Sequence, residues 1–244
     1  MQKTLSPHSP TNDVNKRVSW WRWLIAAFLM LVFPAVILFC SSGHLNWGMA
    51  WVYIGLTTFF AIGSRIIMLQ KTPELLAERG QALNKKDTEP WDKTIMPLVA
   101  IVGPTVILIA AGLDERFGWS PELSKAVHIA AFVITVLAYI LGVWSTVVNK
   151  YFSAVVRIQQ DRGQTVVTSG PYRYVRHPGY SGGIVTNFTI PLLLGSLWAL
   201  APGLLVNGLI VIRTVLEDNT LKDKLDGYRD YARRVRYRLI PGVW

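Results

Sequence analysis

The densest group of chemically versatile side chains lies in residues 168–183, which read TSGPYRYVRHPGYSGG. Glycine and proline make tight turns and let a ligand approach the backbone closely. The tyrosines can stack on a planar ring or form hydrogen bonds, and His177 offers both a ring donor and a ring acceptor. The same composition suits a membrane-interface loop with aromatic and lipid-contacting residues. Residue types alone therefore leave two interpretations open, a small-molecule site and an interfacial loop.

A second candidate is residues 213–218, Arg-Thr-Val-Leu-Glu-Asp, where the last long apolar run ends. Arg213 and Glu217 are four residues apart, so they share one face of a helix. Charged side chains at membrane depth are costly, which favours a functional role. The alternatives are an ordinary i,i+4 pair, worth about 0.2–0.5 kcal/mol, or a helix that has already left the membrane.

Long apolar runs must position these residues. The chain is 51% hydrophobic and only 16% charged, whereas soluble domains are about 25% charged. Four runs approach the roughly 20 residues that span a bilayer: 20–39, 47–69, 94–113 and 126–148. A fifth, 184–212, is interrupted by proline and glycine and predicts two helices with a turn near 195–198. The pattern predicts an all-α integral membrane protein with about six transmembrane helices, the last two as a hairpin.

The first run has a rival interpretation as a signal peptide. It is long for the apolar part of one, and no small-residue cleavage site follows it. These features favour a first helix that is retained in the mature protein.

Lysine and arginine alternate between the connecting segments. The N-terminal segment, residues 70–93, residues 149–180 and the tail after residue 212 are rich in them, whereas the intervening loops carry few. By the positive-inside rule both termini are cytoplasmic, and both candidate segments face the cytoplasm. Topology and anionic lipid headgroups thus explain the net charge of +10 better than nucleic acid does. The single Cys40 excludes an internal disulfide and a multi-cysteine metal site.

The C-terminal tail has its own pattern. Leu221, Leu225, Tyr228 and Val235 recur at helical spacing, with lysines and arginines on the other faces. This predicts a C-terminal amphipathic helix on the membrane surface or over a cytoplasmic pocket.

Four motifs in order, GPYRYVRHPGY, RTVLED, GYRDY and RLIPGVW, resemble the isoprenylcysteine carboxyl methyltransferase family. The resemblance covers about residues 149–244. It implies a membrane core with a cytoplasmic cavity for S-adenosyl-L-methionine. We accordingly divide one integrated membrane domain into N-terminal transmembrane helices, 1–148, and a catalytic half, 149–244. Expected partners are a lipid-like or prenylated small substrate and membrane lipids, without nucleic acid or metal.

The resemblance also implies roles for individual residues. Arg213 matches an arginine that holds the substrate, and residues 164–167 match a strand-like segment that touches the cofactor. Arg157 is an alternative to Gln159. Asp218 stands where many relatives have a second glutamate, and this departure is expected to matter little. The implied cofactor-binding residues are Gln159, Gln164, Thr165, Val166, Val167, Tyr172, His177, Pro178, Gly179, Tyr180 and Glu217.

The physical chemistry of methyl transfer agrees with these roles. Displacement at a sulfonium methyl group needs mainly proximity and alignment. Glu217 can accept hydrogen bonds from a cofactor ammonium or ribose, and Arg213 can clamp a carboxylate bidentately. The chain has no Gly-x-Gly-x-x-Gly turn, which argues against a soluble Rossmann-type methyltransferase.

Several activities remain possible at this point. The resemblance favours carboxyl O-methylation of an isoprenylcysteine-like membrane substrate. Relatives of the catalytic half also methylate phospholipid amines or small thiols. An NADPH-dependent membrane sterol-type reductase and a non-catalytic membrane protein are the alternatives from other classes.

Overall fold

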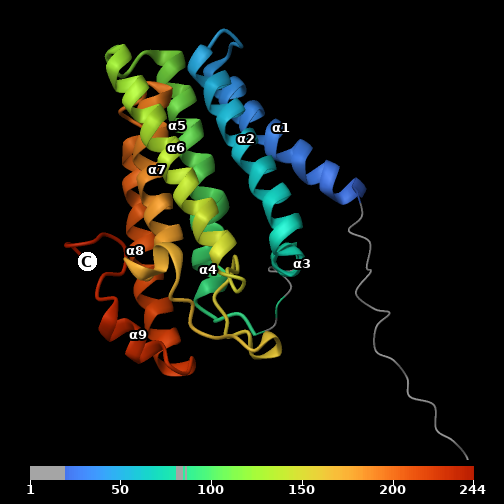
Figure 1. Cartoon of the computed structure of the whole chain (residues 1–244). Coiled ribbons are helices and arrows are strands. Elements are labelled where there is room, and N and C mark those ends of the chain that lie inside the picture. The colour runs from blue at the N-terminus through green and yellow to red at the C-terminus, as the bar shows by residue number, and fades with distance from the viewer. Residues whose placement is uncertain (1–19, 81–84, 86) are drawn as a thin grey trace, which may run out of the picture.

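A computed structural model describes residues 20–80, 85 and 87–244. The predicted cytoplasmic N-terminus lies outside these residues. The described chain forms helices and connecting segments without a β-strand (Figure 1). Its long helices are α1 (Trp20–Ser42), α2 (Gly48–Lys71), α5 (Gly103–Phe117), α6 (Lys125–Val148), α7 (Pro178–Leu194) and α8 (Leu200–Lys224). Shorter ones are α3 (Pro73–Gly80), α4 (Asp92–Pro97) and α9 (Tyr228–Arg234).

Helices occupy every position at which an apolar run predicted one. Four helical rods are long and apolar enough to cross a membrane within the described ranges: α2, the continuous rod Asp92–Phe117, α6 and α8. α1 has 23 residues and α7 has 17. The strongest packing joins α6 to α7, α1 to α5 and α7 to α8.

The rod Asp92–Phe117 is not a uniform α-helix. Pro97 lacks a backbone N–H, and a π-helical turn, Leu98–Val102, follows it before α5 begins. Gly118 ends the rod in the left-handed conformation, with φ of 64°. π-turns inside helices occur frequently at functional sites, which draws attention to this part of the rod.

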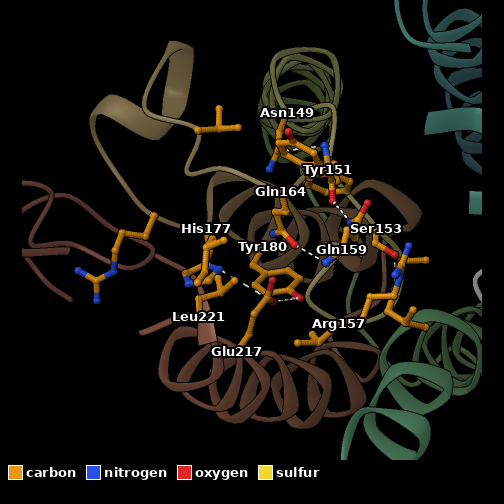
Figure 2. A pocket seen from close by; sticks show the side chains of 18 of the residues that line it. Asn149, Tyr151, Ser153, Arg157, Gln159, Gln164, His177, Tyr180, Glu217 and Leu221 are labelled. Carbon is orange, nitrogen blue, oxygen red and sulfur yellow. Dashed lines mark hydrogen bonds and ion pairs between the residues drawn. The ribbon is translucent and has the colours of Figure 1, made fainter. Parts of the chain in front are cut away.

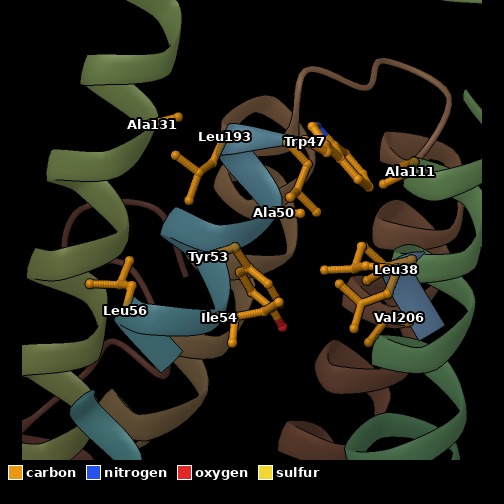
Figure 3. Packing of buried hydrophobic residues seen from close by; sticks show 14 of the residues in the cluster. Leu38, Trp47, Ala50, Tyr53, Ile54, Leu56, Ala111, Ala131, Leu193 and Val206 are labelled. Atoms are coloured by element: carbon orange, nitrogen blue, oxygen red, sulfur yellow. The ribbon is translucent and has the colours of Figure 1, made fainter. Parts of the chain in front are cut away.

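An apolar core holds the helices together (Figure 3). Small residues let them approach closely, as is usual in membrane bundles. At Gly112 in α5 an added Cβ would overlap the Ser41 side chain and the Leu38 carbonyl in α1. The buried core includes Leu38, Trp47, Ala50, Tyr53, Ile54, Ala111, Ala131, Leu193 and Val206. Because the helices are packed together here, this core also fixes the relative positions of their other ends, where the connecting segment 149–177 lies.

Two polar pairs cross the bundle. Thr135 in α6 donates to Thr189 in α7 at 2.7 Å, and Asn187 in α7 donates to Asn207 in α8 at 2.8 Å. Their polar groups are satisfied between helices, as an apolar surrounding requires. These contacts hold α6, α7 and α8 in register.

The tail differs from the continuous amphipathic helix predicted for it. α8 extends to Lys224, the chain turns at Gly227 with φ of 77°, and α9 is only seven residues long. Nevertheless, the predicted apolar positions gather in one cluster. Leu225, Tyr228 and Tyr231 are buried together, with Leu221, Ala232, Val235, Ile158 and Val166 packed against them. The tail thereby packs against the segment that joins α6 to α7.

Candidate functional site

A cavity of about 280 Å³ lies where α7 and α8 meet the connecting segment 149–177 (Figure 2). This volume is near the lower end of the range of about 300–1,000 Å³ for small-molecule sites. Every predicted site residue except Pro178 lines it: Gln159, Gln164, Thr165, Val166, Val167, Tyr172, His177, Gly179, Tyr180, Arg213 and Glu217. The fold therefore brings together residues that lie up to 58 positions apart in the sequence, from 159 to 217.

Pro178 has a different place. It is fully buried at the first position of α7, where a proline has no N–H to satisfy and its fixed φ suits a helix start. It positions the two residues on either side of it, His177 and Gly179, on the cavity wall.

The first turn of α7 and the middle of α8 form one wall of the cavity. Tyr180 donates a hydrogen bond to Glu217 Oε2 at 2.5 Å, and His177 Nδ1 lies 4.0 Å from the same oxygen (Figure 2). The His177 and Tyr180 rings are nearly parallel, with centroids 5.7 Å apart and an interplanar angle of 7°. The wall thus combines two flat rings with a carboxylate whose side chain is 22% exposed.

Tyr172 closes the cavity near the end of α6. It donates to the Ser145 carbonyl at 3.3 Å and accepts from Asn149 Nδ2 at 3.2 Å. Burial raises the pKa of Tyr172, so the phenol stays protonated and acts as a donor.

Residues 151–167 form the opposite wall through hydrogen bonds within the segment. Gln159 is buried, its Nε2 donates to the Tyr151 carbonyl at 2.7 Å, and its Oε1 accepts from Arg162. Gln164 Oε1 accepts from the Gln159 backbone N–H at 2.7 Å. The side chain of Gln159 therefore shapes the wall. Residues 164–167, predicted to be strand-like, are irregular and pair with no strand in the described chain.

Asp218 proves more important than its sequence position suggested. It is fully buried beside Glu217 and accepts hydrogen bonds from Arg176 Nε (2.7 Å), Lys222 Nζ (2.7 Å), Arg238 Nε (3.0 Å) and Tyr228 Oη (3.0 Å). One carboxylate in α8 therefore joins the end of the connecting segment, α9 and the C-terminal segment. The sequence analysis assigned Asp218 no role of its own, and the arginines in two of the motifs, Arg176 and Arg238, were the available signal.

Arg157 forms the reverse arrangement to Asp218, because here one cation binds several carboxylates. Its buried guanidinium binds Glu78 in α3 at 2.8 Å, Asp87 at 2.7 Å and Asp161 at 2.9 Å. Burial alone would lower the pKa of Arg157, but hydrogen bonds to these carboxylates raise it. Arg157 lines the cavity, yet its donors tie the connecting segment to the N-terminal half.

Arg213 already has a carboxylate partner. Its Nε donates to Asp92 Oδ1 at 2.7 Å, and its Nη2 donates to Asp92 Oδ2 at 3.0 Å and to the Ala154 carbonyl at 2.8 Å. Asp92 also accepts from the Val156 N–H at 2.7 Å. The guanidinium edge predicted to clamp a substrate is thus occupied by Asp92. A direct role of Arg213 in substrate binding stays a prediction that depends on its remaining nitrogen, Nη1.

Sequence reasoning missed Asp92 entirely. The signal in the sequence was an acid placed directly before the apolar run 94–113, where a charge near membrane depth requires a partner. In the structure Asp92 is fully buried. The N-terminal half also contributes Arg79, Met96 and Ala100 to the lining. The cavity therefore draws on both sides of the division predicted at residue 148.

The fold defines a multi-pass helical membrane protein with a polar cavity at one end. Residues 129–223 match the model of the isoprenylcysteine carboxyl methyltransferase (ICMT) family, from α6 to the end of α8. The match confirms the predicted resemblance and indicates a methyltransferase. No curated protein sequence matches the chain. The family match does not extend to Glu78, Asp92, Tyr228 or Arg238, although each supports the site.

Proposed function

We propose that this protein transfers the methyl group of S-adenosylmethionine to the carboxylate of an isoprenylcysteine-like membrane substrate. One observation carries the proposal. Except for Pro178, the residues to which the family resemblance assigns cofactor binding converge on a single cavity, although segment 159–180 and Glu217 are separate in the sequence. The match to a methyltransferase family over α6–α8 supports the same conclusion.

The chemistry of the lining fits this cofactor. Glu217 Oε2 accepts from Tyr180, while Oε1 makes no hydrogen bond to another described residue. A carboxylate with spare acceptor capacity suits an ammonium group or ribose hydroxyls. The Tyr172, His177 and Tyr180 rings suit a flat base. When bound, the cofactor supplies a methyl group activated by its sulfonium.

The protein's own contribution is positioning and exclusion of water. An acceptor carboxylate is ionised at neutral pH, so no residue has to remove a proton from it. The buried cluster of Leu225, Tyr228 and Tyr231 covers one side of the cavity. Holding the two reactants in line within a closed space is the main rate advantage available to such a site.

The proposal includes a topology. It has six membrane helices, α7 and α8 as a hairpin, and a cytoplasmic cavity with both termini on the same side. In Figure 1 the turns after α1, α5 and α7 lie at one end, and α3, the connecting segment and α9 lie at the other. The second end carries most of the lysine and arginine of the described loops. Reporter fusions at Asn46 and at the C-terminus should report opposite sides, and the same side for both would refute this topology.

Ligand binding tests the proposed activity. Calorimetry on the purified protein should detect S-adenosylmethionine binding and no comparable NADPH binding. Methyl transfer is then measured to a farnesylcysteine analogue, a phospholipid amine and a small thiol. Transfer to an amine or thiol alone would refute the carboxyl assignment and retain the methyltransferase. Binding of NADPH alone would favour a reductase, and binding of neither would favour a non-catalytic protein.

A further inference from the structure

The cavity lining contains arginines with contrasting partners. Arg157, Arg176 and Arg213 each bind a buried or partly buried carboxylate. Arg79, in α3, also lines the cavity, but it makes no ion pair with a residue that the structure describes. The neighbouring acid Glu78 is already shared between Arg157 and Lys85. Arg79 is thus the lining arginine whose charge no described carboxylate neutralises.

An aromatic contact orients Arg79. Its guanidinium carbon lies 5.5 Å from the centroid of the Phe152 ring, a cation–π distance. Phe152 in turn packs against the start of α7, because an added Cβ on Gly179 would overlap its ring. This chain of contacts places Arg79 at the cavity wall. Met96 and Ala100, from the rod that contains the π-turn, line the cavity as well and add apolar surface.

A second arginine, Arg65, lies outside the cavity lining but close enough for its charge to act on Arg79. Burial lowers the pKa of Arg79, and the positive charge of Arg65, in α2, lowers it further. Arg65 Nη1 is buried without a hydrogen-bond partner among the described residues. Two guanidinium groups of the same sign, one partly desolvated, cost free energy unless an anion approaches them. The arrangement therefore favours an anionic group in the cavity beside Arg79.

We propose that Arg79, supported by the charge of Arg65, binds the anionic group of the methyl acceptor, whose apolar chain lies along Met96 and Ala100. The acceptor is thus an oxyanion on an apolar chain, either a carboxylate or a phosphate. This inference rests on the proposed function for its acceptor, but the anion site is a separate physical claim. It assigns a specificity-determining residue to the N-terminal half, outside the segment that matches the family.

The test compares an acid with a neutral analogue of the same shape. Binding of N-acetyl-S-farnesylcysteine, its carboxamide and farnesyl phosphate is measured by calorimetry on wild type, Arg79→Gln, Arg79→Lys and Arg65→Gln. The wild type should prefer the acid to the carboxamide at least tenfold, as expected for one hydrogen bond between charged groups. Arg79→Gln should lose this preference, Arg79→Lys should retain part of it, and Arg65→Gln should reduce it.

Arg116→Gln is the matched control. Arg116 also lies 5.5 Å from a phenylalanine ring, that of Phe117, at the other end of the rod. It should retain the full preference for the acid. An unchanged preference in Arg79→Gln, or no preference in the wild type for either anion, would overturn the inference. Tighter binding of farnesyl phosphate than of the acid would identify phosphate as the anion.

Cofactor binding separates the two proposals. S-adenosylmethionine affinity should be similar in the wild type and in the Arg79 variants, which also shows that the variants are folded. A wild type that prefers the acid but binds no S-adenosylmethionine would refute the proposed function and leave the anion site standing. If the wild type and Arg79→Gln methylate the acceptor with the same KM, only the anion site is refuted.

Discussion

Two charge networks flank the cavity, and they are built in opposite ways. Behind the wall formed by the first turn of α7 and the middle of α8, called the C-terminal wall here, one carboxylate, Asp218, binds three cations and is fully buried. The opposite wall, formed by residues 151–167, is called the N-terminal wall here because it is tied to α3. Its guanidinium, Arg157, binds three carboxylates: Glu78 is buried, and the side chains of Asp87 and Asp161 are 54% and 56% exposed. Buried ion pairs are costly to break, whereas exposed ones contribute little. The C-terminal wall should therefore be rigid at every partner of Asp218 that is buried, whereas the N-terminal wall should tolerate change at its exposed acids, Asp87 and Asp161.

The largest expected effect is on the C-terminal wall. Asp218→Asn removes the charge that Arg176, Lys222 and Arg238 share, and should lower the free energy of unfolding by about 3–5 kcal/mol. Denaturant unfolding in detergent measures this. The control is Asp230→Asn, whose exposed pair with Arg233 should change stability by less than about 1 kcal/mol. Equal effects of the two variants would show that burial does not set the contribution of Asp218 to stability.

The next largest effect concerns the pair that joins the walls. Arg213→Ala leaves Asp92 buried without its bidentate partner and frees the carbonyl of Ala154. Turnover should fall about a hundred- to a thousandfold, as when one preorganised donor is lost. Arg213→Lys should recover only part, because it lacks the planar fork.

Asp92→Asn distinguishes the two roles open to Arg213. If Arg213 positions the wall, both variants should lower turnover together, with little change in cofactor affinity. If Arg213 binds the acceptor directly, freeing its guanidinium in Asp92→Asn should lower the acceptor KM. A loss of cofactor binding in Arg213→Ala would instead assign Arg213 to the cofactor site.

A smaller effect is expected at Glu217, the carboxylate next to Asp218 in α8. Glu217→Ala should weaken S-adenosylmethionine binding about ten- to a hundredfold, the range for a hydrogen bond to a charged group. Tyr180→Phe removes only the donor to Glu217 and should have a smaller effect. Calorimetry on folded variants measures both. Unchanged affinity in Glu217→Ala would show that it does not contact the cofactor.

The smallest effect is expected on the N-terminal wall. Asp161→Asn removes one exposed partner of Arg157 and should change stability by less than about 1 kcal/mol. The hydrogen bond from Arg157 lowers the pKa of Asp161. Its contribution is therefore full at neutral pH and is lost only as the pH falls below the ordinary value of about 4. A comparison of thermal unfolding at pH 7 and pH 3.5 should show the variant approaching wild type at the lower pH.

The sequence by itself determined where the helices lie and which residues are chemically able to form the site. Apolar runs predict membrane helices because each run must bury its length in lipid, a property of the run alone. The motif around His177 and Tyr180, and the placement of Glu217 on a helix, identified one wall of the cavity for a similar reason. Their types and local spacing carry the information.

Only the tertiary structure decided which charges meet. Asp92 binds Arg213 across 121 residues, and Glu78 binds Arg157 across 79. No local spacing relates such partners, because their meeting depends on how the helices pack and where the connecting segment folds back. The same packing separates Arg79 from the described acids while it places Arg157 among three of them. The sequence contains the arginines, but the fold decides which of them bind a carboxylate of the protein and which can bind a ligand. An arginine can bind an anionic ligand only where no buried carboxylate of the protein already pairs with it.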